Sequence, residues 1–260
     1  MLYVRGNKRD YDLWAEMGAY GWSWDEVLPY FMKSEDNRDP SIASNGYHGV
    51  GGLLTVTSPP DSTPISLAFP EAGKYLGYPN VDINGPTQTG FTIPQGTVRR
   101  GARCSTGKAF LNSARDRENL HVVTFAYATK ILFNEFKRAV AVNFDRFGLT
   151  HTVYARKEIV ISGGSVNSAQ LLMLSGVGPR DHLEALGIPV VADLPVGLNL
   201  QDHIYPGGVH FSFEGKFSFI QRRVVSIPNL ISYFASGRGK FKSYFLFLYY
   251  FFFFFLLIFS

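Results

Sequence analysis

Cysteine is almost absent from this sequence, because Cys104 is the only one among 260 residues. The chain can therefore form no intrachain disulfide and no Cys-X-X-Cys metal or redox motif. A single cysteine does not define the redox compartment. Arg100 and Arg103 lie nearby in the sequence and would favour a reactive thiolate, but we interpret Cys104 as a buried structural residue.

Several catalytic and metal-binding motifs are also missing. There is no Gly-X-Gly-X-X-Gly dinucleotide fingerprint and no Gly-X-Ser-X-Gly nucleophile elbow. Gly49-Val50-Gly51 lacks a third glycine and precedes a strand-like run, Leu53 to Val56, rather than a helix. No two of the histidines have metal-ligand spacing; they are His48, His121, His151, His182, His203 and His210. We therefore assign no metal site and no catalytic residue, and we interpret His48 as a structural loop residue.

Charge of one sign is not concentrated anywhere in the sequence. The formal net charge is only +4, and its densest cluster is Arg99-Arg100 with Arg103, followed by the pair Arg222-Arg223. Neither cluster is interleaved with aromatic residues, so we expect no nucleic-acid partner. The composition, 46% apolar and 18% charged, is typical of a globular protein, and 260 residues suffice for one large domain or two small ones.

The two ends of the sequence differ in composition. The start has no signal peptide, because charged residues follow Val4 at once. The end, Tyr244 to Ser260, contains eight of the 23 phenylalanines and is at the lower limit of length for a membrane anchor. We favour another hypothesis, that the run is translated intron sequence, since phenylalanine codons are pyrimidine-rich. Membrane association is expected only if this tail is genuine.

The central feature of the sequence is a strand–turn–helix pattern at Lys157 to Gly178. Glu158 to Ser162 is a β-branched run that predicts a buried strand, and Gly163-Gly164 permits a sharp turn. Ser165 is the predicted N-cap of a helix that Gly176 ends. An ordinary βα unit would give the same pattern, but a strand that enters a helix through glycines is also how α/β proteins approach a phosphate.

Other helices are expected on either side of this feature. They cover Asp10 to Met17, a segment that begins with a capping box at Ser23, Ile65 to Leu76, and Pro179 to Leu186. Pro29 should kink the second helix or end its first part. We interpret the aromatic residues of the first two segments as core packing rather than as a ligand cage; they are Trp14, Trp22, Trp24, Tyr30 and Phe31.

Short strands are expected between these helices. They are Asn119 to Thr124, Ala128 to Phe133, Ala139 to Phe147 and His151 to Ala155, with Gly148 in the turn between the last two. Their spacing predicts an antiparallel meander inserted in an α/β domain, so the fold class is α/β in the mixed, α+β sense. A further strand is expected at Gly208 to Phe213.

Several segments resemble the glucose–methanol–choline (GMC) oxidoreductases. Gly163-Gly164-Ser165 followed by Ser168 to Pro179 is similar to the second signature of that family, with Ala169 where the family usually has proline. Leu194 to His203 resembles the segment that follows it. The stretches LPYFMKSED and GARCSTGKAFL are most similar to the insect, glucose dehydrogenase-like subgroup. The resemblance implies a partial FAD-binding Rossmann-like domain with an inserted β-meander, plus fragments of an antiparallel-sheet substrate domain.

The resemblance also implies a division of the chain into five portions. They are flavin-adjacent helices and a loop at 1–62, a substrate-domain portion at 63–100, an FAD-binding portion with the meander at 101–200, the start of the substrate-domain sheet at 201–240, and the phenylalanine-rich tail at 241–260.

The cofactor that this resemblance implies is FAD. The implied substrate is a small alcohol or sugar, oxidised by hydride transfer to the flavin N5 atom, and the electron acceptor is left open. Flavin contacts are implied at Leu2 and Tyr3, at the backbone of Ala128, and at the turn of Gly163 and Gly164. Similar insect-type proteins are often secreted, but this chain does not define its own compartment.

The resemblance covers a middle slice of the family, without its N-terminal nucleotide-binding motif and its C-terminal catalytic histidine. We therefore expect residues 1–260 to be inactive by themselves. Two alternatives remain open. One is a degenerate, non-catalytic GMC-like protein, and the other is a membrane-tethered structural protein that uses the phenylalanine-rich tail.

Overall fold

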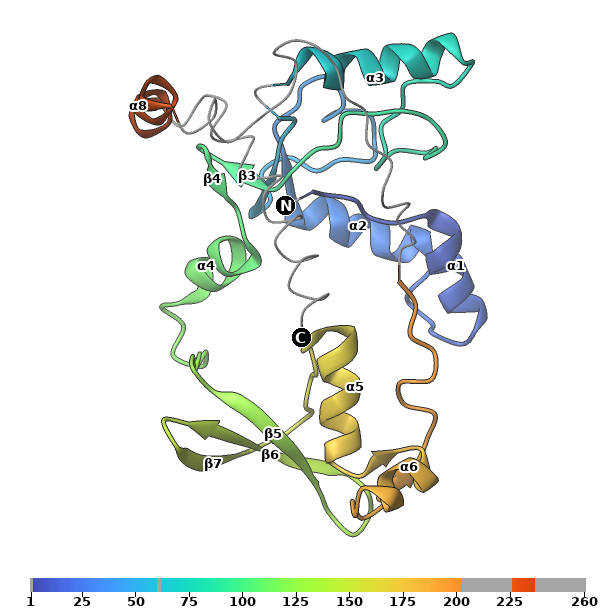
Figure 1. Ribbon diagram of the computed structural model, residues 1–260, viewed down its shortest axis with the longest axis vertical. Coiled ribbons are helices and arrows are strands. Elements are labelled where there is room, and N and C mark those ends of the chain that lie inside the picture. The colour runs from blue at the N-terminus through green and yellow to red at the C-terminus, as the bar shows by residue number, and fades with distance from the viewer. Residues whose placement is uncertain (1, 60–61, 203–225, 237–260) are drawn as a thin grey trace. The chain divides into compact units, whose positions relative to one another are not determined.

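The computed structural model describes residues 2–59, 62–202 and 226–236, and its contacts divide the chain into two units (Figure 1). Unit 1 comprises Met1–Leu120 and Ser212–Ser260, and unit 2 comprises His121–Phe211. Both units contain helices and strands, which confirms the predicted mixed fold class. The strand expected at Gly208 to Phe213 and the phenylalanine-rich tail lie outside the described residues.

Unit 1 is built from short helices and two-stranded pairings. Strand β1 pairs with β2 in parallel, and β3 pairs with β4 in an antiparallel hairpin. The hairpin turn holds Arg100 at φ 48° and Gly101 at φ 81°, the backbone geometry of a tight two-residue turn. The elements are α1 (Lys8–Glu16), α2 (Trp24–Ser34), β1 (Glu35–Asn37), β2 (Leu54–Val56), α3 (Pro64–Tyr75), β3 (Val98–Arg99), β4 (Ala102–Arg103), the π-helix η1 (Gly107–Leu111), α4 (Asn112–Ala114) and α8 (Ile227–Ser236).

The helices expected in unit 1 are present. α1 ends just before Gly18, whose φ of 102° stops the helix. α2 begins with the predicted capping box, in which the Ser23 N–H donates to the Glu26 carboxylate at 3.1 Å. The helix continues through Pro29 to Ser34, so the proline does not end it. α3 confirms the helix expected at Ile65 to Leu76.

The aromatic residues of α1 and α2 contact one another but are only partly buried. Tyr11 packs against Trp14, Trp24 and Phe31, with ring centroids 5.1–5.8 Å apart. Trp24 is 5% exposed, whereas Trp14 is 47% exposed. Trp22 and Tyr30 are also exposed, so the prediction that all these rings are core residues is wrong. Trp14 contacts Tyr11 and Trp22 but stays exposed, so contact with other aromatic rings does not bury these side chains. Cys104, in contrast, is fully buried, as predicted.

Unit 2 is organised around a three-stranded antiparallel sheet in the order β5-β6-β7, with α5 packed against β5 (Figure 1). The meander is confirmed, and Phe147 and Gly148, both with positive φ, form the two-residue turn between β6 and β7. Gly176 (φ 91°) follows the end of α5, as predicted. The elements are β5 (Tyr127–Phe133), β6 (Ala139–Arg146), β7 (Leu149–Tyr154), α5 (Gly164–Leu174), β8 (Val177–Gly178), α6 (Arg180–Ala185) and β9 (Ala192–Asp193).

Two of the expected strands are not formed. Asn119 to Thr124 is irregular and mostly exposed, and Glu158 to Ser162 pairs with no described strand. Val160, which was expected to be buried, is 77% exposed. A β-branched run becomes a strand only where another strand accepts its backbone hydrogen bonds, and the described residues provide none here.

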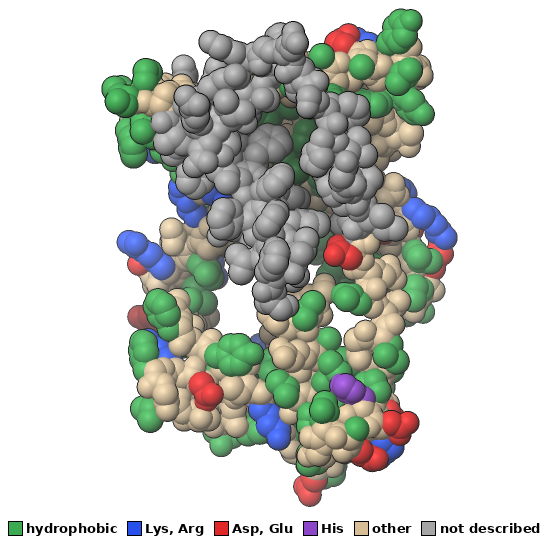
Figure 2. Space-filling model, in the orientation of Figure 1, with side chains coloured by type: hydrophobic (Ala, Val, Ile, Leu, Met, Phe, Trp, Pro, Cys, Tyr) green, Lys and Arg blue, Asp and Glu red, His purple; other side chains and the backbone are tan. Residues whose placement is uncertain are grey.

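Many apolar side chains reach the surface of both units (Figure 2). In unit 2 they include Phe136, Phe147 and Tyr154, each more than 70% exposed. None of the helices in the described ranges combines the length and the apolar character that a membrane span requires.

Candidate functional site

The predicted flavin-contact residues Leu2 and Tyr3 lie in an extended segment at the start of unit 1. Leu2 forms an isolated antiparallel bridge with Gly96, and the Tyr3 N–H donates to the Gln95 carbonyl at 2.9 Å. The Asn84 side chain holds the same segment from the other side. Its amide nitrogen donates to the Tyr3 carbonyl at 3.1 Å, and its oxygen accepts the Arg5 N–H at 2.9 Å.

The end of this segment is anchored by a buried ion network of four side chains. The Arg5 guanidinium lies 2.5 Å from the Glu35 carboxylate, and both side chains are fully buried. His48 Nδ1 lies 3.0 Å from Glu35, and His48 Nε2 lies 2.8 Å from the Asp82 carboxylate. The Gly49 N–H donates to Glu35 at 3.0 Å. The network therefore joins four segments of unit 1 that are far apart in the sequence.

The residues of this ion network stabilise one another's charged forms. Burial alone would lower the pKa of His48, but its hydrogen bonds to Asp82 and Glu35 raise that pKa to about 9. Burial would raise the pKa of Glu35 and of Asp82, but the hydrogen bond from His48 is the largest of the interactions that lower both. At neutral pH the network therefore contains two positive and two negative charges, and loss of one would leave an unpaired charge in the interior.

The predicted glycine turn lies at the start of α5 in unit 2. The helix begins at Gly164, with Gly163 as its N-cap, so the prediction of Ser165 as the N-cap is wrong. Gly164 has φ 84°, a conformation that a residue with a Cβ rarely adopts, so this position favours glycine. The Gly163 N–H donates to the Ser168 hydroxyl at 3.1 Å.

Ala128, the other predicted contact, lies near the start of β5. This strand is at the edge of the sheet, so part of its backbone faces away from β6. Its register shifts between Ala128 and Lys130, and the side chain of Ala128 is exposed. Farther along the strand, the Ile131 N–H donates to the Ser175 hydroxyl at 2.8 Å, which ties β5 to the end of α5.

The five predicted residues fall into two groups. Leu2 and Tyr3 belong to unit 1, whereas Ala128, Gly163 and Gly164 belong to unit 2. Within each group the residues lie on elements that pack or bond together. Strand β5 contacts helix α5, and the bond that joins them, from Ile131 to Ser175, lies at the end of α5 away from Gly163 and Gly164.

Comparison with known protein families identifies the family of this chain. The sequence profile described as GMC oxidoreductase matches residues 1–205. The chain belongs to the GMC oxidoreductase family. Among GMC relatives, glucose dehydrogenase [FAD, quinone] of Drosophila melanogaster is 47% identical over 207 residues, which are 78% of this chain and 33% of the relative. Human mitochondrial choline dehydrogenase is 43% identical over 206 residues, 78% of this chain and 34% of the relative.

Solved GMC-like structures share the same fold. Pyridoxine 4-oxidase from Mesorbium loti superimposes with a TM-score of 0.69 at 33% identity, covering 75% of this chain and 38% of its own. An FAD-dependent oxidoreductase from Chaetomium thermophilum gives a TM-score of 0.67 at 35% identity, with 75% of this chain and 36% of its own covered. The chain thus spans about a third of the length of the curated relatives it matches.

The sequence did not reveal the ion network. The interpretation of His48 as a structural residue is supported by its buried position. No sequence pattern distinguishes its partners Arg5, Glu35 and Asp82 from other charged residues. No periodicity or motif connects charges that are separated by 13 to 34 residues. Within the ranges that the structure describes, no group of three or more His, Cys, Asp or Glu side chains is arranged to hold a metal ion.

Proposed function

We propose that this chain forms part of the flavin site of an FAD-dependent oxidoreductase that acts on a CH–OH group of an alcohol or sugar. The observation that carries the proposal is the 47% identity to a glucose dehydrogenase whose name includes FAD and quinone. The choline dehydrogenase relative supports the broader substrate class, since choline is also an alcohol.

The glycine turn of unit 2 fits a dinucleotide cofactor. An ideal Cβ placed on Gly164 would meet no atom within 4 Å, so the space beside the turn is open. The first turn of α5 has no side-chain cap, and the first N–H groups of a helix have no partner within the helix, so they suit oxygen atoms of a ligand. Strand β5 lies at the edge of its sheet, so backbone groups on its outer side are not paired with another strand of that sheet. This position supports a backbone contact at Ala128.

In this proposal the residues of the chain bind and orient the cofactor. When bound, FAD supplies the hydride acceptor for alcohol oxidation. The backbone of Gly163 and Gly164 would hold it at the start of α5, and the backbone of Ala128 would hold it from β5. For unit 1 we propose flavin contacts at Leu2 and Tyr3, in the segment that the ion network anchors.

We propose further that residues 1–260 by themselves neither retain FAD tightly nor oxidise alcohols. The support is the unpaired segment Glu158 to Ser162, which leaves β-branched side chains and backbone groups exposed beside the glycine turn. In addition, we propose no residue within the described ranges as the base that removes the alcohol proton. Absence of such a base lowers the rate by roughly 10²–10⁴-fold.

The test compares the 260-residue chain with the longest natural protein that contains it. Both are purified with excess FAD, and flavin absorbance and dye reduction are measured with glucose and with choline. We expect a colourless, inactive short chain and a yellow longer protein that reduces the dye. If the longer protein is colourless, the proposed function is wrong. If the 260-residue chain is yellow and active, only the proposal that it is inactive by itself is wrong.

A further inference from the structure

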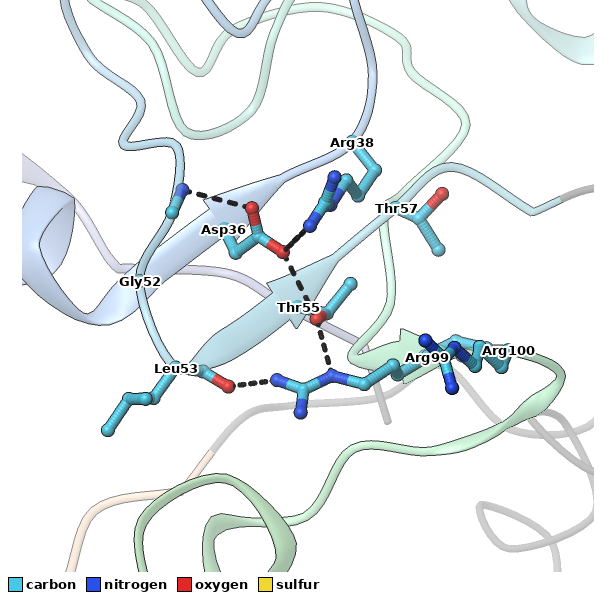
Figure 3. A pocket seen from close by; sticks show the side chains of 10 residues that line it. Asp36, Arg38, Gly52, Leu53, Thr55, Thr57, Arg99 and Arg100 are labelled. Atoms are coloured by element: carbon cyan, nitrogen blue, oxygen red, sulfur yellow. Dashed lines mark hydrogen bonds and ion pairs between the residues drawn. The ribbon is translucent and has the colours of Figure 1, made fainter. Parts of the chain in front are cut away.

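Unit 1 contains a pocket that the proposed function does not use. It has a volume of about 620 Å³ and lies between β1, β2 and the β3–β4 hairpin (Figure 3). Its charged lining residues are Asp36, Arg38, Arg99 and Arg100, and we call it the arginine pocket. A volume of this size is in the range of small-molecule sites.

The charges of the arginine pocket do not balance. Asp36 is its only acidic lining residue, and its carboxylate is already occupied. One oxygen accepts the Gly51 N–H at 3.0 Å, and the other lies 2.7 Å from the Arg38 guanidinium and 3.3 Å from the Thr55 hydroxyl. Arg38 therefore forms an ion pair with Asp36, while Arg99 and Arg100 remain uncompensated by any lining carboxylate. The pocket has a formal charge of +2.

Two of the guanidinium groups are held in fixed orientations. Arg99 Nε donates to the Thr55 hydroxyl at 2.8 Å, and Arg99 Nη2 donates to the Leu53 carbonyl. Arg38 uses Nε and Nη2 on the Asp36 carboxylate. Neither Nη1 group has a hydrogen bond to a described residue, so each keeps donors for a ligand. An arginine that is already oriented loses less side-chain freedom when a ligand binds.

Arg100 is presented differently, from the tip of the hairpin. It occupies the turn with φ 48°, is exposed, and forms no hydrogen bond or ion pair with any residue that the structure describes. Figure 3 shows its side chain at the same pocket as those of Arg99 and Thr57. A positive φ at a non-glycine residue is uncommon, and here it places the Arg100 side chain at the pocket.

We propose that the arginine pocket binds a small dianion that carries phosphate or carboxylate oxygens. Planar guanidinium groups bond such oxygens with two parallel N–H donors, which is why arginine predominates at phosphate and carboxylate sites. A charge of +2 matches a doubly charged ligand better than a singly charged one. The proposal goes beyond the flavin chemistry, because it depends only on residues of unit 1 and needs no flavin.

Calorimetric titration tests this proposal on the 260-residue chain. Inorganic phosphate and succinate are titrated separately at pH 7.5, with sodium chloride at the same ionic strength as the reference. We expect saturable binding of at least one dianion and none of chloride. Binding of phosphate alone or of succinate alone would identify which oxygen chemistry the pocket selects.

Two variants and a matched control localise the binding. Arg100→Gln removes a charge that has no structural bond, and we expect it to weaken binding about tenfold or more, the loss typical of one charge-assisted hydrogen bond. Arg99→Gln should weaken binding at least as much, although it also removes the bonds to Thr55 and Leu53. Arg115→Gln, an exposed arginine outside the pocket, should leave the affinity unchanged.

Three outcomes would overturn the proposal. The first is the absence of saturable heat with both dianions in a chain whose tryptophan fluorescence reports a folded unit 1. The second is an equal loss of affinity in Arg115→Gln, which would indicate general charge attraction. The third is unchanged affinity in Arg100→Gln and Arg99→Gln.

Discussion

In unit 1 the described residues include nine buried polar or charged side chains, whereas in unit 2 Ser175 is the only one. The ion network of unit 1 joins segments that are far apart in the sequence, from Arg5 to Asp82. The meander of unit 2 joins neighbouring strands through short turns, such as the one between Arg146 and Leu149. The two units are therefore stabilised by different interactions.

This difference implies different sensitivities to mutation. A buried charge network is strongly destabilised when one member is neutralised, because its partners remain charged in the interior. A meander with a small core depends more on the backbone geometry of its turns and helix ends. Charge changes should therefore affect unit 1 most, and changes at glycines with positive φ should affect unit 2.

The largest effect is expected for Glu35→Gln. The substitution leaves Arg5 and protonated His48 without their shared carboxylate, and we expect a loss of about 3–5 kcal/mol in the free energy of unfolding of unit 1. All three tryptophans, Trp14, Trp22 and Trp24, lie in unit 1, so tryptophan fluorescence during urea unfolding reports this unit. The same substitution at Glu71, which is 66% exposed, should cost less than about 0.5 kcal/mol. Similar losses for both variants would contradict a stabilising role of the network.

The stability of unit 1 should also depend on pH. The pKa of His48 is raised to about 9 from an ordinary value of 6.5, so its contribution is complete below pH 6.5 and is lost as the pH rises through 9. The pKa values of Glu35 and Asp82 are lowered, so the stability that these two carboxylates contribute is lost as the pH falls. That loss occurs only near or below their ordinary pKa values of about 4, far from the range in which His48 loses its proton. Burial raises the pKa of Tyr3, so its ionisation lies above this range.

The pH prediction is measured as the unfolding free energy of unit 1 at pH 6.5 and pH 9.5. We expect a decrease of about 3 kcal/mol, since each unit of pKa shift corresponds to about 1.4 kcal/mol. His48→Gln should be less stable at pH 6.5 and should lose most of the pH dependence. If the wild-type chain has the same stability at both pH values, His48 does not hold a proton in the interior.

Two glycines of unit 2, both with positive φ, test how strongly this unit depends on its backbone geometry. Gly176 (φ 91°) and Gly148 (φ 78°) differ in their surroundings. A Cβ at Gly176 would lie 2.4 Å from the Pro189 carbonyl oxygen, whereas a Cβ at Gly148 would meet no atom within 4 Å. Gly148→Ala should therefore cost about 1 kcal/mol from backbone strain, and Gly176→Ala roughly 2–3 kcal/mol because overpacking is added.

Hydrogen exchange of the β5 and β6 amides measures both glycine variants, since unit 2 contains no tryptophan. We expect faster exchange in Gly176→Ala than in Gly148→Ala. Equal rates would mean that the backbone around Pro189 moves away without cost. Neither substitution should alter the tryptophan fluorescence of unit 1.

The features that could be predicted from the sequence are local ones. The capping box at Ser23, the turn at Gly148 and the end of α5 at Gly176 each depend on a few neighbouring residues, and each is confirmed. The prediction of a strand at Glu158 to Ser162 was wrong, because a strand needs a neighbouring strand to accept its backbone hydrogen bonds and the described residues provide none. The ion network was missed for a related reason, because buried charges are stabilised by partners that the chain brings together only when folded.

The candidate site was predicted from family motifs rather than from physical patterns. The glycines at 163 and 164 lie at the start of a helix, as expected, but the predicted N-cap was wrong, since the helix begins at Gly164 with Gly163 as its N-cap. Ala128 lies on a strand, as expected. Flavin contacts at these positions and at Leu2 and Tyr3 remain predictions, since the comparisons concern the family and not these residues.

A smaller effect than that of Gly176→Ala is expected for Gly164→Val. A Cβ at this position would meet no atom within 4 Å, so the substitution introduces no clash. The φ of 84° is unfavourable for a β-branched residue, and we expect a cost of about 1–2 kcal/mol, measured by hydrogen exchange of the α5 amides. Ser165→Val, the next position in α5, should cost less than about 0.7 kcal/mol because that residue lies within the helix. In the longer protein Gly164→Val should also lower the flavin content, since the valine side chain fills the open space beside the turn. Equal stability and equal flavin content in the two variants would show that the turn is an ordinary helix start.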